Sequence, residues 1–340
     1  MGQVNTKTSS ILNFLNTSSP STGRIASVDH CRGLCILLMV GGNFAGKFAF
    51  MPWILTHHKY GLTIAEIFGP VFFLMVGFGY RLSFLRRQEA LGTRTAAQSA
   101  ARRHVSILLL GLVVYFGHFW DALTHIGMAG LLLLPVIGRS WRIRCAAAIL
   151  FVSLYQVLYL YTGYGAWLME HDYSLNGGPL AVLSWGFIIL CGTLVHDTWS
   201  LRDKQAMTHI LPVLGIGLIC SGWLLSLPWQ GVKESWPYTR YGMTLPFPVT
   251  TAGAAILIYC IFYWYCDLHG RRLPLVSPIG ANPILMYAIM GAFIGASKLL
   301  IQVWGEPGFY KALASYIGIC AICYVVAAVL YHKNISLRFS

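Results

Sequence analysis

The 340-residue chain is poor in charge: 10% of its residues are Asp, Glu, Lys or Arg, whereas 56% are hydrophobic. A soluble domain carries roughly a quarter charged residues, so this chain lacks the polar side chains that would cover its surface in water. Its mean hydropathy is +0.63. Apolar runs near the ~20 residues that cross a bilayer recur along it. The composition therefore excludes an ordinary soluble domain and predicts an all-α polytopic membrane protein.

Acidic residues are especially scarce, with 11 Asp and Glu against 24 Lys and Arg, which gives a net charge of +13. In a soluble chain such an excess would suggest a nucleic-acid partner. In a membrane protein it has a simpler origin, because cytoplasmic loops collect Lys and Arg. We therefore expect lipid, and no nucleic acid, as the surroundings of this chain.

Several sequence signals are absent. The first 23 residues are polar and lack the basic start and apolar stretch of a cleavable signal, so we expect a mobile tail over 1–23 and one membrane domain over 24–340. There is no G-x-S-x-G, H-E-x-x-H or P-loop pattern, which leaves the soluble hydrolase, zinc protease and ATPase interpretations without support. The nine cysteines show no metal-ligand spacing in a loop, and no metal site is predicted.

The apolar runs predict a single bundle of about ten transmembrane helices. Their approximate bounds are 33–51, 62–84, 104–119, 122–138, 145–162, 179–197, 208–227, 246–266, 278–300 and 313–332. A cytoplasmic N-terminus places 1–33, 81–104, 139–144, 198–204, 267–272 and 332–340 on the cytoplasmic side. These segments hold 18 of the 24 Lys and Arg residues, so we predict that both termini are cytoplasmic.

The loops on the other side, near 43–61, 163–178, 228–246 and 301–312, are rich in Trp, Tyr, Gly and Pro. Aromatic side chains at this level anchor helices at the lipid headgroups. The alternative is that they form a wall for a sugar or a lipid above a cavity. Composition alone leaves both interpretations open.

Ionisable groups inside a bilayer cost roughly 2.5–3.5 kcal/mol each at a helix centre, so each needs a partner or a function. Asp29 and Arg32 are three residues apart and can pair on one helix face, with Ser27 as a cap; a helix-entry ion pair and a functional role are both open. Asp197, beside basic residues, is expected at the interface. The other members of this set are Glu66, His118, Asp121, His125 and Lys298.

His57 and His58 differ from these groups because they lie in an outer loop directly before an apolar run, with Glu66 at its start. An imidazole takes up and releases a proton near neutral pH, as acyl transfer to a hydroxyl or amine requires. Solvated loop histidines are the simpler alternative.

Two consecutive stretches carry a family resemblance: "SVDHCRGLCILLMVGGNFAGK" and "HHKYGLTIAEIFGPVFFLMVGFGY". They resemble the transmembrane acetyltransferases typified by heparan-α-glucosaminide N-acetyltransferase and its bacterial relatives. That family reads S-V-D-x-x-R-G, then an Asn after the first apolar run, then H-A-x-W-x-G-x-T-x-A-D-x-x-F-P. The positions that match are Ser27, Val28, Asp29, Arg32, Gly33, Asn43, Gly61, Thr63, Ala65, Phe68 and Pro70. Weaker similarity extends the resemblance over roughly 24–330.

Three departures from the family pattern affect its site. Glu66 replaces the family Asp, Gly69 is inserted before Pro70, and Tyr60 stands for the Trp in a loop one residue shorter. Aligning Tyr60 with that Trp puts His57 on the family's catalytic histidine. His58 stays open as the alternative register.

The resemblance implies transfer of an acetyl group from cytoplasmic acetyl-CoA to a hydroxyl or amine of a sugar, glycan or glycolipid across the membrane. It implies His57 as general base, Asn43 as a donor to the thioester oxygen, and Glu66 as an orienting carboxylate or a packing group. Arg32 and the basic 81–104 loop are expected to face the CoA phosphates, and Asp29, three residues before Arg32, is expected in the same cofactor site. A cavity is expected to run continuously from that basic side to Asn43 and His57.

Two other classes are retained. One is a transporter for a small anion or lipid precursor, since intramembrane Asp, Glu and His also build proton relays, although paired broken helices are not apparent. The other is a structural membrane protein. By resemblance to the compact bacterial form, a bacterial inner membrane is expected; the acceptor and a homo-oligomeric state are left open.

Overall fold

The computed structural model describes residues 24–46, 48–115, 119–171, 176–228, 236–305 and 307–333. Every regular element in this part of the chain is helical, which confirms the predicted all-α class. The expected tail, 1–23, and His118 lie outside the described residues. The principal helices are α2 (Ala26–Ala45), α3 (Ile64–Leu91), α4 (Thr93–Val114), α5 (Ala122–Leu132), α6 (Leu134–Ile137), α7 (Trp141–Tyr161), α8 (Tyr164–Glu170), α9 (Val182–Ser200), α10 (Leu211–Ser226), α11 (Pro246–Phe262), α12 (Ser277–Ala281), α13 (Pro283–Trp304) and α14 (Phe309–His332).

Each of the ten predicted apolar runs overlaps a helix. Six helices within the described residues are long and apolar enough to cross a bilayer: Ile64–Leu91, Trp141–Tyr161, Pro179–Ser200, Ala206–Ser226, Pro246–Leu268 and Phe309–His332. Ala122–Leu132 and Pro283–Ser297 are shorter apolar helices. The chain is therefore an integral membrane protein that crosses the bilayer several times. The count of ten and the cytoplasmic location of both termini stay predictions.

Two expected helix boundaries are wrong. The predicted loop 81–104 is helical, because α3 continues to Leu91 and α4 begins at Thr93. Only Gly92, with a φ of +82°, separates them, a conformation that glycine adopts without steric cost. The predicted span 122–138 is also interrupted: α5 ends at Leu132, and Pro135 sits in the first turn of the short α6, where its missing N–H is tolerated.

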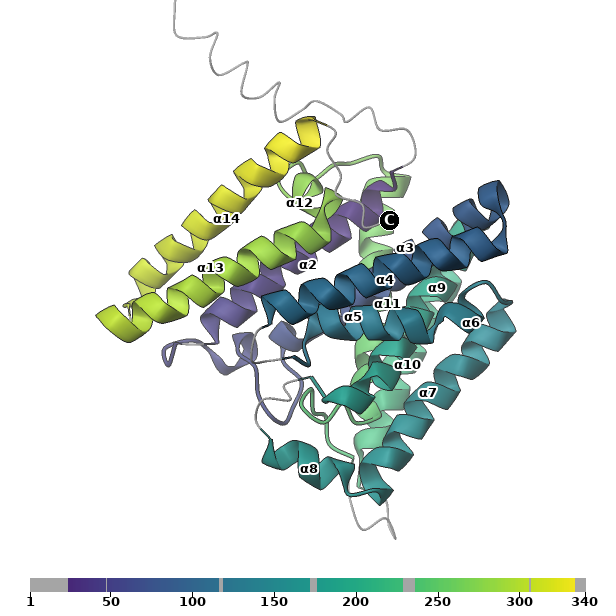
Figure 1. The fold of residues 1–340 in the computed structure, drawn as a ribbon, viewed down its shortest axis with the longest axis horizontal. Helices are drawn as coiled ribbons and strands as arrows, with labels where there is room; N and C mark the ends of the chain where they lie inside the picture. The colour runs from purple at the N-terminus through teal and green to yellow at the C-terminus, as the bar shows by residue number, and fades with distance from the viewer. Residues whose placement is uncertain are drawn as a thin grey trace, which may run out of the picture.

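Helix α3 is the centre of the bundle and packs against α2, α4, α9 and α11. It crosses α9 at two glycines: an added Cβ at Gly77 would collide with the carbonyl oxygen of Ile189, and one at Gly192 with that of Leu74. The two backbones can therefore approach closely, as small residues allow between membrane helices. Figure 1 shows α13 and α14 beside α2 on one side of the molecule, and α6 and α7 on the opposite side.

A buried ion cluster closes one end of this core. Asp197 near the end of α9 accepts hydrogen bonds from Arg81 on α3 (Nε to Oδ1, 3.0 Å) and from Arg144 on α7. Arg144 is fully buried and also donates to the Thr193 hydroxyl at 2.6 Å. Asp197, whose side chain is 29% exposed, therefore joins three helices, and its interfacial position stays a prediction.

Candidate functional site

The loop between α2 and α3 is fixed by Glu66, the third residue of α3. Its carboxylate accepts hydrogen bonds from the backbone N–H of His58 (3.1 Å) and of Thr63 (3.3 Å). The second bond belongs to a capping box, in which the first-turn carboxylate satisfies an otherwise unpaired N–H before the helix. The Thr63 hydroxyl donates to the carbonyl oxygen of Thr56 at 3.0 Å. Glu66 and Thr63 together therefore fix the segment 56–63, which carries the two histidines.

The two histidines have different surroundings. The His58 ring stacks on Trp53 with centroids 4.9 Å apart, and its Nε2 lies 2.7 Å from the Thr56 hydroxyl. His58 is thus held by its own loop. His57 instead lines a cavity, and its Nδ1 is buried without a hydrogen-bond partner among the described residues.

That cavity, called here the His57 cavity, has a volume of about 90 Å³. It brings together the three groups that the sequence placed near one another: Asn43 on the last turns of α2, His57 in the loop, and Glu66 on α3. Asn43 is exposed, whereas Glu66 is 1% exposed. The remaining lining residues are Met39, Ala65, Gly69, Pro70, Phe73, Asp121, Ala122, Asn176, Trp185, Arg240 and Tyr287.

Sequence reasoning missed Arg240, Asn176 and Tyr287. The Arg240 guanidinium lies 5.5 Å from the Tyr241 ring centroid, and its Nε is buried without a partner in the described part of the chain. The only signal for it was its place among the few basic residues outside the segments that are predicted to be cytoplasmic. Asn176 donates a hydrogen bond to the Asp121 carboxylate at 2.8 Å, which gives Asp121 a partner. No sequence motif indicates this pairing.

The electrostatics of the cavity keep His57 neutral. Burial first, and then the positive charges of Arg240 and His58, together lower the pKa of His57 from 6.5 to about 3. A neutral imidazole with an unpaired ring nitrogen is able to accept a proton from a bound group.

A second cavity, of about 460 Å³, lies at the opposite end of α2 and α3 and is called here the arginine cavity. Five arginines line it: Arg24, Arg32, Arg86, Arg87 and Arg103. Asp29 lines it as well, 4.0 Å from Arg24. The two residues predicted to meet a cofactor, Asp29 and Arg32, therefore share one cavity.

The predicted pairing of Asp29 with Arg32 is wrong. Arg32 donates to the carbonyl oxygen of Met75 on α3 at 2.7 Å, and the ion pair of Asp29 is with Arg24. The predicted cap is also wrong, since Ser27 lies inside α2 and donates through both its N–H and its hydroxyl to Asp267. Arg32 and Ser27 are thus bonded to distant helices, whereas Asp29 pairs with a residue five positions before it.

Within the described residues, the two ends contain separate cavities rather than the expected continuous path. The two cavities share no lining residue. Between their levels, Ile36 on α2 and Leu74 and Met75 on α3 are fully buried. Passage of a ligand from one end to the other requires these side chains to move.

The His57 cavity contains a neutral base, His57, and the hydrogen-bond donors Asn43 and Arg240. The arginine cavity, at the other end, concentrates positive charge. The described residues contain no group of three His, Cys, Asp or Glu side chains placed to hold a metal ion.

One comparison with known proteins finds a matching family. A family model described as heparan-alpha-glucosaminide N-acetyltransferase, catalytic, matches residues 24–206, which is more than half of the chain. The matched range contains Asp29, Arg32, Asn43, His57 and Glu66, and it confirms the resemblance seen in the sequence. No curated protein matches the chain.

Proposed function

The chain belongs to the heparan-alpha-glucosaminide N-acetyltransferase catalytic family, and from that premise we propose that it moves an acetyl group from acetyl-CoA to a hydroxyl or amine. The donor binds at the arginine cavity, and the acceptor at the His57 cavity. The observation that carries the proposal is the unpaired, buried imidazole of His57 in a cavity that also contains Asn43 and Arg240.

In the proposed reaction, His57 takes the proton of the acceptor hydroxyl or amine as that atom attacks the thioester carbonyl. The carbonyl oxygen gains negative charge, and the side-chain amide of Asn43 donates a hydrogen bond to it. Collapse of the tetrahedral intermediate breaks the C–S bond and releases the CoA thiolate, which the imidazolium protonates. A positioned general base contributes roughly 10²–10⁴ in rate, and one oxyanion donor roughly 10²–10³.

Glu66 and His58 hold the loop in place and take no part in the proposed proton transfer. The Glu66 carboxylate is occupied by the N–H groups of His58 and Thr63, so it fixes the course of the loop that carries His57. His58 is bonded within that loop. We assign the catalytic role to His57 and a positioning role to Glu66.

The arginine cavity suits the phosphates of CoA. Guanidinium groups bind phosphate through paired, charge-assisted hydrogen bonds, and five of them converge here. Positive charge also collects at the cytoplasmic ends of membrane helices, so we place this end in the cytoplasm. The arm of CoA would then pass between α2 and α3, where Met75 has a flexible, adaptable side chain.

Acetyl transfer from labelled acetyl-CoA by the purified protein in detergent tests this function. We expect label in the acceptor fraction when a membrane lipid extract or hexosamines are supplied, because a transferase works without a sealed membrane. A transporter of a small anion would need vesicles and would leave the thioester intact. The proposal is wrong if the folded protein neither binds acetyl-CoA nor transfers its acetyl group to any acceptor.

A further inference from the structure

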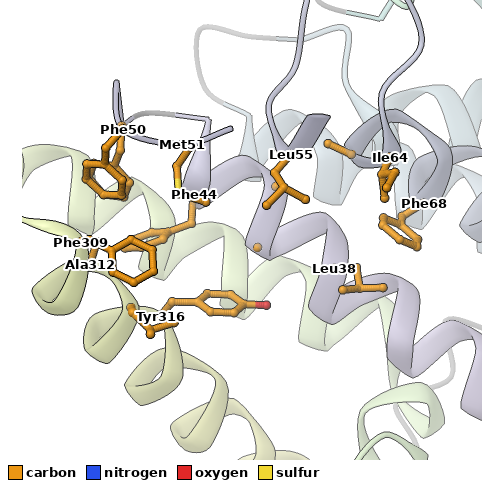
Figure 2. A pocket seen from close by; sticks show the side chains of 15 residues that line it. Leu38, Phe44, Phe50, Met51, Leu55, Ile64, Phe68, Phe309, Ala312 and Tyr316 are labelled. Atoms are coloured by element: carbon orange, nitrogen blue, oxygen red, sulfur yellow. The ribbon is translucent and has the colours of Figure 1, made fainter. Parts of the chain in front are cut away.

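A third cavity, of about 310 Å³, is lined by apolar side chains from α2, the loop after it, α3 and α14. Figure 2 shows Phe44, Phe50 and Phe309 gathered at one end of this apolar cavity and Ile64 and Phe68 at the other. The remaining lining residues are Leu38, Gly41, Gly42, Phe48, Met51, Leu55, Ala65, Ala312, Leu313 and Tyr316.

The apolar cavity and the His57 cavity are neighbours. Ala65 lines both of them. Gly42 lines the apolar cavity, and a Cβ added to Gly42 would lie 3.5 Å from the Ala65 Cβ and 3.7 Å from the His57 Nε2. The wall between the apolar space and the imidazole is therefore made of the two smallest residue types.

Among the described residues that line the apolar cavity, Tyr316 carries the one polar side chain. Its hydroxyl already donates to the carbonyl oxygen of Leu37 at 2.8 Å. A sugar placed there would lose its hydrogen bonds to water without replacement, which is strongly unfavourable. A hydrocarbon chain loses nothing by entering, so hydrocarbon is the chemistry that fits.

The apolar cavity also opens toward the lipid. Phe309 is 51% exposed and Ile64 is 43% exposed, and in a membrane protein the medium outside such apolar side chains is acyl chain. Trp53 and Tyr60, in the loop beside them, are exposed aromatics of the kind that sits at the headgroup level. A lipid whose chain lies in the apolar cavity therefore carries its headgroup close to His57.

We propose that the acceptor is a membrane lipid: its hydrocarbon chain occupies the apolar cavity, and its headgroup hydroxyl or amine enters the His57 cavity. This inference rests on the proposed acetyl transfer and names its substrate class. Anchoring the chain holds the headgroup beside the base, and such pre-orientation raises the rate of a reaction between two bound groups.

Filling the apolar cavity tests the proposal. Leu313→Trp places a large indole ring on a lining residue that is 44% exposed. Ile322→Trp is the matched control, because Ile322 is 50% exposed on the same helix and does not line the cavity. The probe for binding is phosphatidylglycerol with a diazirine in its acyl chain, in vesicles of phosphatidylethanolamine and phosphatidylglycerol. The readout for transfer is labelled acetyl in the chloroform-extractable fraction of a membrane lipid extract.

We expect the diazirine to label residues of the apolar cavity in the unmodified protein and in Ile322→Trp. In Leu313→Trp this labelling is lost, and transfer to lipid falls at least about tenfold, the discrimination that one misplaced methylene gives in an apolar pocket. Binding of acetyl-CoA stays unchanged in all three proteins.

Other outcomes contradict the inference in distinguishable ways. Acetyl transfer to water-soluble sugars but not to lipid, at equal rates in both variants, would overturn the lipid acceptor and leave the proposed function intact. Labelling of the cavity without acetyl transfer to any acceptor would overturn both. Equal lipid labelling and equal transfer to lipid in the two variants would show that this cavity does not hold the acceptor.

Discussion

His57 and His58 are adjacent in the chain, yet only one of them reaches the cavity. The sequence alone left two registers open, because the loop is one residue shorter than the family pattern. The ring of His58 is bonded to Thr56 and stacked on Trp53, whereas the Nδ1 of His57 is buried and unpaired among the described residues. The difference arises from how the loop folds onto Glu66, which residue types alone do not specify.

The pKa of His57 predicts an unusual pH dependence. A general base works only when it is deprotonated, and burial lowers the pKa of His57 to about 3. With an alcohol acceptor, kcat/KM for acetyl transfer should therefore stay flat as the pH falls through 6.5, the ordinary histidine value, and decline only toward about 3. A fall in kcat/KM centred near 6.5 would contradict the buried, neutral imidazole.

Substitution of Arg240 is a second way to change the pKa of His57. Its positive charge helps to lower the pKa of His57, so Arg240→Gln should raise that pKa and move the acidic decline of kcat/KM to higher pH. Arg240→Lys keeps the charge and should leave the decline near its original position. Burial is the larger cause, so the Gln variant should remain below the ordinary histidine value. Identical pH profiles in the two variants would show that the charge of Arg240 does not act on His57.

At the scale of helices, the hydrophobic runs predicted correctly which segments form helices, but predicted poorly where the helices begin and end. The basic stretch 81–104 was expected as a loop because its charges interrupt the apolar pattern. It forms helix because Arg, Gln, Glu and Ala are strong helix formers, so the charges interrupt the apolar pattern without ending the helices. Only Gly92 breaks them.

The cluster of Asp197, Arg81 and Arg144 predicts that the thermal stability of the bundle depends on Asp197. Asp197→Ala leaves the fully buried Arg144 without its carboxylate, and removal of one partner from a buried ion pair costs about 3–5 kcal/mol. We expect the thermal unfolding midpoint in detergent, followed by tryptophan fluorescence, to drop sharply. Asp203→Ala is the control, since Asp203 is exposed at the same end. Equal midpoints for the two variants would contradict the structural role of the cluster.

At the scale of the whole molecule, the His57 cavity is assembled from distant segments. Asn43, His57 and Glu66 are close in sequence, and a family resemblance was enough to predict that they lie together. Asn176 and Arg240 come from loops far along the chain, and only the packing of the bundle brings them to the same place. The separation of the two cavities among the described residues was equally impossible to predict from the sequence.

The orientation in the membrane is a prediction for the whole molecule. The excess of basic residues in one set of segments, and the arginine cavity among them, place that end in the cytoplasm. A reporter that is active only in the cytoplasm, fused after Ser340, should be active, and a single cysteine introduced at Lys59 should react with a membrane-impermeant thiol reagent added from outside. The reverse result in both assays would invert the topology.

The most direct test of the central claim is the rate of acetyl transfer by His57→Ala and His58→Ala, with acetyl-CoA affinity measured on the same preparations. His57→Ala should reduce turnover by at least about 10², the lower range for a positioned general base, and should bind acetyl-CoA normally because the arginine cavity is at the other end of the bundle. His58→Ala should retain most of its activity, since its side chain only supports the loop. If His57→Ala transfers acetyl at the wild-type rate, or if only His58→Ala loses activity, the assignment of His57 as the base is wrong.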